Sequence, residues 1–186
     1  MKERKVTKAD VGNNDIRHLY QTAFPVEEQI PWNDLMRLIE EMPLDFTAYY
    51  DSDKSTSQQE QQDLFIGFTI VFPRDSFNWF WYFAVREELR GKGYGQQILT
   101  HLLKQYEGKT MILDMESPDQ PADNAPQRKR RHPFYLRNGF HDTHVYLTYS
   151  DITFTIMTTG TETFTMDDWD QIIAELQQHW WHEPTT

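Results

Sequence analysis

Three glycines stand at alternating positions in the segment 86–99, REELRGKGYGQQIL, which directly follows the apolar run 77–85. The glycines are Gly91, Gly93 and Gly95, and the cations around them are Arg86, Arg90 and Lys92. A turn of this kind between a strand and a helix directs backbone N–H groups at one point, where the helix N-terminus adds partial positive charge. Glycine lets an anion approach the backbone because it has no Cβ. The spacing therefore predicts a phosphate-binding turn.

Two common phosphate motifs do not fit this spacing. A P-loop follows its last glycine with Lys and then Ser or Thr, and a dinucleotide fingerprint has a glycine three residues after Gly93. Gln96 stands at both positions.

The net charge of −11 argues against a general nucleic-acid-binding protein, which needs a basic face for phosphates. The chain has no cysteine, which excludes disulfides, thiolate metal sites and cysteine nucleophiles.

The segment RGKGYG, residues 90–95, resembles the pyrophosphate-binding motif Gln/Arg-x-x-Gly-x-Gly/Ala of the GNAT superfamily, the acyl-CoA-dependent N-acyltransferases. The preceding FAVR and the later FYLRNGF, residues 134–140, are similar to further signatures of that family and stand in the family's order. The resemblance covers about residues 5–158. It implies acetyl-CoA as co-substrate, no metal, a turn that holds the pyrophosphate, and a preceding strand that pairs with the pantetheine arm. The residues carried over are Phe83, Ala84 and Val85 for the arm, and Arg90, Gly91, Lys92, Gly93, Tyr94, Gly95 and Gln96 for the pyrophosphate.

Acetyl transfer to an alkylamine poses two proton problems, since the ammonium must lose a proton and the leaving thiolate gains one. The resemblance implies that Tyr135 is the general acid, because a phenol is protonated at neutral pH. Glu116 ends an apolar strand, and alternation puts Asp114 on the same face. A carboxylate there could accept the ammonium proton, and a solvated strand end is the alternative. Pro133 predicts a kink in the helix that carries Tyr135, which would displace its hydroxyl.

In this family the acceptor pocket is built by the segment between the first two helices and by the late hairpin. Here these parts hold aromatic side chains that could form a slot and carboxylates that could hold a cation. The candidates are Phe24, Trp32, Tyr146 and Tyr149 for the slot and Glu27 and Glu28 for the cation. Each is also explained by ordinary packing or a solvated surface. These residues favour a small, partly apolar primary amine without identifying it.

The basic run QRKRRH, residues 127–132, falls on a predicted helix, where its charges spread around the circumference and are mostly solvated. Arg128 could meet the adenosine 3′-phosphate of coenzyme A. His141 and His144 have no third ligand at a suitable spacing, so no metal site is expected.

Hydrophobic periodicity and turn residues predict a single domain over residues 1–186 with a C-terminal helical extension over 159–186. The expected order is strand, two helices, three strands, helix, strand, helix, two strands and a final helix. This is a mixed, mostly antiparallel α/β sheet with helices on both faces, and the resemblance adds a splay between the fourth and fifth strands. Strands are expected over 4–9, 44–50, 64–72, 77–85, 110–116, 145–150 and 152–159.

Two other functions stay open at this point: a non-catalytic acyl-CoA-binding or sensing protein of the same fold, and an unrelated nucleotide-binding module. No stretch has the apolar length of a signal peptide or a membrane span, which favours a cytoplasmic protein without a membrane or nucleic-acid partner. A homodimer is also open, because the last helix could pack on its own sheet or on a second copy.

Overall fold

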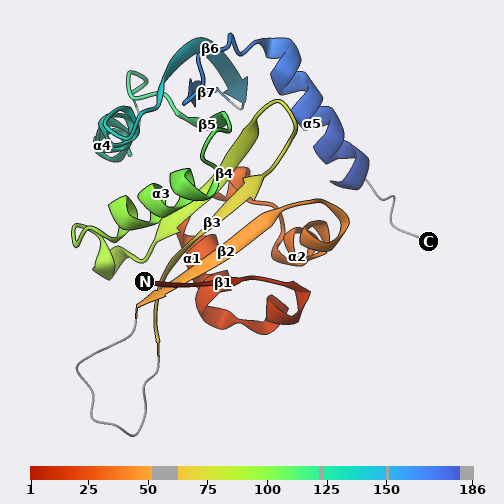
Figure 1. The fold of residues 1–186 in the computed structure, drawn as a ribbon, viewed down its shortest axis with the longest axis vertical. Coiled ribbons are helices and arrows are strands. Elements are labelled where there is room, and N and C mark those ends of the chain that lie inside the picture. The colour runs from red at the N-terminus through yellow and green to blue at the C-terminus, as the bar shows by residue number, and fades with distance from the viewer. Residues whose placement is uncertain (52–62, 122–123, 150, 181–186) are drawn as a thin grey trace, which may run out of the picture.

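The computed structural model describes residues 1–51, 63–121, 124–149 and 151–180. Figure 1 shows one twisted sheet with helices packed around it. The strands are β1 (Lys2–Lys5), β2 (Asp45–Asp51), β3 (Leu64–Phe72), β4 (Asn78–Val85), β5 (Met111–Glu116), β6 (His141–Tyr149) and β7 (Ile152–Thr158). The helices are α1 (Asn14–Ala23), α2 (Trp32–Glu41), α3 (Tyr94–Gln105), α4 (Ala125–Leu136) and α5 (Met166–Trp180), with short 3₁₀ turns at Lys8–Gly12, Val26–Glu28 and Glu87–Leu89. None of the described helices combines the length and the apolar character needed to cross a bilayer.

The seven strands form one sheet in the order β1-β2-β3-β4-β5-β7-β6. Every neighbouring pair is antiparallel except β4 and β5, which are parallel. These two strands share only the pairs Asn78↔Met111 and Trp79↔Ile112, after which they diverge. The predicted mixed sheet and its splay between the fourth and fifth strands are confirmed.

The sheet separates two apolar cores, because successive strand residues face opposite sides. The core under α1, α2 and α5 includes Tyr20, Leu35 and Ile172, which are fully buried. The core under α3 and α4 includes Leu99 and Tyr135. Helices therefore cover both faces, as predicted (Figure 1).

A bulge interrupts the pairing of β4 with β3. The register runs from Phe80↔Val71 to Tyr82↔Ile70, so Trp81 is the extra residue. A bulge of this kind breaks the alternation and re-aims side chains. Trp81 and Tyr82 consequently both belong to the core under α1, α2 and α5, although they are adjacent in sequence.

Helix α5 begins with a capping box. The N–H of Thr165 donates to the Asp168 carboxylate at 2.8 Å, and the N–H of Asp168 donates to the Thr165 hydroxyl oxygen at 3.4 Å. Trp169, Ile172 and Leu176 point into the core, each at most 7% exposed. The helix thus packs on its own sheet, a choice that the sequence left open.

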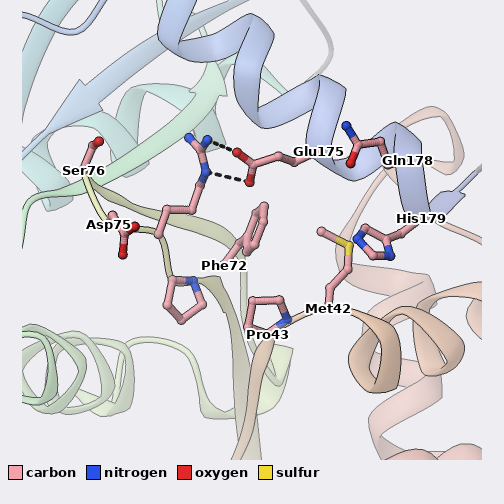
Figure 2. Close-up of a pocket in the computed structure, with 10 residues that line it drawn as sticks. Met42, Pro43, Phe72, Asp75, Ser76, Glu175, Gln178 and His179 are labelled. Atoms are coloured by element: carbon pink, nitrogen blue, oxygen red, sulfur yellow. Dashed lines mark hydrogen bonds and ion pairs between the residues drawn. The ribbon is translucent and has the colours of Figure 1, made fainter.

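Two basic side chains attach the far end of α5 to the rest of the fold. Arg74, in the turn between β3 and β4, forms a two-bond ion pair with Glu175, in which Nε donates to Oε2 at 3.0 Å (Figure 2). Arg37 on α2 donates from Nη1 to the carbonyl oxygen of His179 at 2.9 Å. A pocket of about 430 Å³ lies between this turn, the end of α2 and α5.

Helix α4 contains Pro133 and is nevertheless helical from Ala125 to Leu136. The proline removes one backbone N–H donor from the helix interior. Gly139, with φ of 89°, follows the helix end in the left-handed conformation that glycine favours. Tyr135 therefore lies on a helix that continues past the proline, and the kink expected at Pro133 stays a prediction.

Candidate active site

The glycine turn between β4 and α3 uses conformations that favour glycine. Gly91 and Gly93 have φ of 75° and 85°, a region that costs other residues roughly 1–2 kcal/mol. Gly93 immediately precedes α3, and within the described part of the chain no side chain caps this helix end. The first intrahelical bond runs from the N–H of Gln97 to the carbonyl oxygen of Gly93 at 3.1 Å. The N–H of Gly95 therefore has no intrahelical acceptor, and the helix end suits an anion.

The same turn lies against the end of β4. A Cβ added at Gly95 would stand 3.8 Å from Phe83 Cζ and 3.9 Å from Val85 Cγ2, which is ordinary contact. Arg90 folds back and donates from Nε to the carbonyl oxygen of Val85 at 3.2 Å. The turn and the last residues of β4 thus form one continuous surface.

The hydrogen-bond pattern of β3 and β4 shows which backbone groups of β4 face the gap. The N–H of Arg86 donates to the carbonyl oxygen of Ile66 at 2.9 Å. Hydrogen-bonded and non-hydrogen-bonded pairs alternate in antiparallel strands, so the N–H and C=O of Phe83 and Val85 point away from β3, toward the gap. The prediction that Ala84 also offers backbone groups there needs correction, because its groups face β3 by the same alternation.

A cavity of about 350 Å³ lies where β4 and β5 diverge. Its walls come from both strands beyond their last shared pair, from the segment between α1 and α2, from the hairpin of β6 and β7, and from α5. The aromatic wall residues are Phe24, Trp79, Trp81, Tyr82, Tyr149, Phe154 and Trp169, the carboxylates are Glu27, Glu28, Asp114 and Glu116, and Arg131 is the basic residue among them. The cavity therefore combines an apolar wall with a strongly acidic one.

Two of these carboxyl groups have raised pKa values. Burial raises the pKa of Glu28 from its ordinary 4.5 to about 7, with Glu116 and Asp114 adding to the effect and Arg131 opposing it. One Glu28 oxygen, Oε1, is buried without a hydrogen-bond partner among the described residues. Burial also raises the pKa of Asp114, which accepts a hydrogen bond from Trp79 Nε1 at 2.7 Å. Glu28 can therefore take up or release a proton near neutral pH.

Glu116 is not the solvated strand end that the sequence allowed. It is only 4% exposed, and Arg128, equally buried, donates from Nη2 to its Oε1 at 2.5 Å. Asn124 donates to both carboxylate oxygens at 2.9 and 3.1 Å. These donors occupy both oxygens of the Glu116 carboxylate. The placement of Arg128 also needs correction, since its guanidinium is directed at Glu116 in the interior and not displayed for a 3′-phosphate.

Tyr135 is buried on α4, on the opposite side of the sheet from α1. Its ring packs edge-on against Phe134 and Phe140, with centroid distances of 5.3 and 5.6 Å. Burial raises the pKa of its phenol, while Arg131 opposes the rise. The phenol is consequently protonated at neutral pH.

Two tyrosines hold the segment that carries Glu28. The Tyr82 hydroxyl donates to the carbonyl oxygen of Glu28 at 2.5 Å. The Tyr20 hydroxyl donates to the carbonyl oxygen of Ile30 at 3.1 Å and accepts from its N–H at 2.8 Å. These bonds fix the segment between α1 and α2 against β4, and thereby fix the Glu28 backbone beside the cavity.

The structure brings some predicted acceptor residues to the cavity and leaves others outside. Phe24, Glu27 and Glu28 line it. Trp32 does not, because it is buried in the core and its Nε1 donates to the carbonyl oxygen of Val11 at 2.8 Å. Tyr146 is 55% exposed on β6, outside the cavity. The predictions that Trp32 and Tyr146 line the acceptor pocket are therefore corrected.

Sequence reasoning gave no site role to Trp79, Trp81, Tyr82 or Trp169, all of which line the cavity. An aromatic run such as residues 77–85 is typical of a strand buried on both faces, which gives none of its residues a site role. The bulge that turns adjacent residues to one side has no clear sequence signal. Among the described residues, no group of three or more His, Asp or Glu side chains could hold a metal ion.

Comparisons with known proteins agree with this geometry. A family model described as the acetyltransferase (GNAT) domain matches residues 56–142, which include the glycine turn and Tyr135. A search of curated proteins found no match.

Solved structures share the fold at low sequence identity. A protein from Bacteroides thetaiotaomicron assigned to the GNAT family of acetyltransferases has 23% identity and a TM-score of 0.73, over 98% of this chain and 100% of that one. An aminoglycoside 6′-N-acetyltransferase solved with coenzyme A has 15% identity and a TM-score of 0.61, over 85% and 96%. NAA60 of Arabidopsis thaliana, solved with a bisubstrate analogue, has 13% identity and a TM-score of 0.57, over 84% and 95%. The family model thus matches the part of the chain that holds the glycine turn and Tyr135, and the solved structures show that nearly the whole chain has the fold of these GNAT proteins.

Proposed function

We propose that this protein is an N-acetyltransferase that moves the acetyl group of acetyl-CoA to the primary amine of a small acceptor. One observation carries the proposal. The stretch of β4 that β5 leaves unpaired has the acidic, aromatic cavity at its start and the glycine turn at its end. A donor held by the turn and an acceptor held in the cavity would meet along this one strand.

The residues present fit coenzyme A. The positive-φ glycines of the turn and the uncapped end of α3 suit a pyrophosphate, and the outward N–H and C=O groups of Phe83 and Val85 suit the amides of the pantetheine arm. The aminoglycoside acetyltransferase of the same fold, solved with coenzyme A, supports this choice of ligand. When bound, acetyl-CoA would supply a thioester whose C–S bond breaks as the N–C bond to the amine forms, leaving a free thiol.

Glu28 is the proposed proton acceptor for the incoming ammonium. An alkylammonium has a pKa near 10, so reaching the neutral amine at pH 7 costs about 4–5 kcal/mol. The Glu28 carboxyl, with a pKa of about 7 and one buried oxygen without a partner, can accept that proton. Glu116 is less suited because Arg128 and Asn124 occupy its oxygens. Its proposed role is to hold α4 against the end of β5.

Tyr135 is the proposed proton donor on the leaving side. The raised pKa of its phenol keeps the proton available at neutral pH. Asn124 and Arg128, at the start of the helix that carries Tyr135, both donate to Glu116. These bonds therefore also position the tyrosine.

The test combines calorimetric titration with coenzyme A and a thiol-release assay over a panel of primary amines. The expected result is tight coenzyme A binding, amine-dependent thiol release, and a Tyr135→Phe variant that loses about 10²–10⁴-fold in kcat with unchanged coenzyme A affinity. If the protein binds coenzyme A but releases no thiol with any amine, the protein is the non-catalytic acyl-CoA binder and the proposal fails.

A further inference from the structure

The aromatic wall of the cavity consists of rings stacked along β4. Trp79 and Trp81 are stacked with centroids 4.5 Å apart, and Trp81 and Tyr82 are stacked with centroids 5.0 Å apart. Trp169 of α5 meets Trp79 at a right-angled 5.3 Å. Trp81 therefore stacks on two rings, and because stacking takes up ring faces, the edges are the part of Trp81 left for a ligand in the cavity.

This arrangement decides how a ligand can use the wall. A cation is attracted to the face of an aromatic ring, where the π electrons are, and not to the edge. Because the neighbouring rings take up the faces of Trp81, the stack offers little to an ammonium group. A ring edge does favour the face of another aromatic ring, in an edge-to-face contact. The wall is thus suited to an aromatic or apolar body.

The charge of a ligand must then be met elsewhere in the cavity. Glu116 is already paired with Arg128. Glu28 and Asp114 line the same cavity, and neither forms an ion pair among the described residues, although Arg131 lines the cavity too and opposes the rise in both pKa values. These two carboxyl groups form a short acidic end beside the aromatic wall.

The volume of the cavity limits the size of the ligand. Its volume of about 350 Å³ is near the lower end of the range for small-molecule sites, roughly 300–1,000 Å³. A single ring with a short side chain fits within that volume, whereas a multi-ring sugar would extend beyond it.

We propose that the acceptor is a small arylalkylamine, whose ring packs on the edges of the Trp79–Trp81–Tyr82 stack and whose ammonium lies between Glu28 and Asp114. This inference rests on the proposed acetyltransferase function and names its acceptor class. A linear polyamine is disfavoured because it has no ring to make an edge-to-face contact with the stack, and an aminoglycoside because of its size and polarity.

Direct binding to the full chain saturated with coenzyme A tests the acceptor class without relying on turnover. Four probes are titrated by calorimetry: phenethylamine, butylamine with the same charge and no ring, phenethyl alcohol with the same ring and no charge, and spermidine. We expect phenethylamine to bind about tenfold more tightly than each of the other three, because it alone uses both walls. Equal or tighter binding of butylamine or spermidine would overturn the inference.

Two variants test which residues cause the preference for phenethylamine. Trp81→Leu should weaken phenethylamine binding about fivefold or more and leave butylamine binding unchanged, while Glu28→Gln should weaken both amines and leave phenethyl alcohol unchanged. Tyr146→Phe, exposed outside the cavity, is the matched control and should change nothing. If Trp81→Leu does not fold, the comparison of the four probes on the unaltered protein still decides.

Thiol release separates this inference from the proposed function. Acetylation of spermidine or an aminoglycoside in preference to phenethylamine would refute the acceptor class and leave the acetyltransferase intact. Selective phenethylamine binding without thiol release from acetyl-CoA would refute the transferase and leave the binding preference standing.

Discussion

Replacing Glu28 with Gln removes the group that we assign as proton acceptor while keeping its shape. A carboxyl with a pKa of about 7 is about one-tenth ionised at pH 6 and about nine-tenths ionised at pH 8. The ratio of kcat/KM between the unaltered enzyme and Glu28→Gln should therefore rise about tenfold from pH 6 to pH 8 and level off above it. At pH 8 the loss in the variant should be roughly 10²–10⁴-fold.

The ratio is the quantity to measure, because the ionisation of the amine substrate affects both proteins equally and cancels. Initial rates of thiol release at subsaturating amine give kcat/KM, which reports the free enzyme. Glu27→Gln, an exposed carboxylate at the same cavity, is the matched control and should give a ratio that does not vary with pH. A flat ratio for Glu28→Gln over this range would refute the assignment of Glu28.

The raised pKa of Glu28 also has a consequence for folding. Between pH 4.5 and about 7 the folded protein keeps the Glu28 proton and the unfolded chain releases it. Rising pH through this window therefore lowers the free energy of unfolding by less than about 3.5 kcal/mol, since each pKa unit is worth about 1.4 kcal/mol and solvent screens this half-buried group. Glu28→Gln should lack this loss and be more stable than the unaltered protein at pH 8, as denaturant unfolding at pH 5 and pH 8 would reveal. An equal stability difference at both pH values would contradict the burial of this carboxyl.

Three further variants test other parts of the site. Gly93→Ala should lose about 1–2 kcal/mol of stability because of its φ of 85°, whereas Gly95→Ala, which meets only ordinary contacts within the protein, should change stability little by thermal melting; equal losses of stability would contradict the turn geometry. Arg128→Met should cost about 3–5 kcal/mol in denaturant unfolding because it leaves Glu116 charged and buried, and a cost below about 1 kcal/mol would show that the pair is not desolvated. Glu175→Gln breaks the ion pair with Arg74 drawn in Figure 2, and should raise the KM for the amine without changing coenzyme A affinity. A changed coenzyme A affinity with an unchanged KM would show that α5 does not shape the amine site.

Local features of the chain were enough to predict the glycine turn to which we assign the coenzyme A pyrophosphate. The glycine turn works through backbone conformation, and glycines spaced around residues 91–95 specify that conformation wherever the segment is placed. The element order followed from hydrophobic periodicity in the same way, and so did the capping box at Thr165 and Asp168. These signals lie within a few residues of one another, so no distant contact is needed to interpret them.

The acceptor side depended on contacts between distant residues. Trp32 and Trp81 are equally aromatic in the sequence, yet one fills the core and the other lines the cavity, because a bulge in β4 and the position of α2 decide their directions. Glu28 and Glu116 are both acidic, and only the fold pairs Glu116 with Arg128 and leaves Glu28 in a buried site that raises its pKa. The chain by itself determined which backbone turn can hold a phosphate, since conformation is a local property. Only the tertiary structure decided which carboxyl group can accept a proton, because burial and neighbouring charge are properties of the assembled interior.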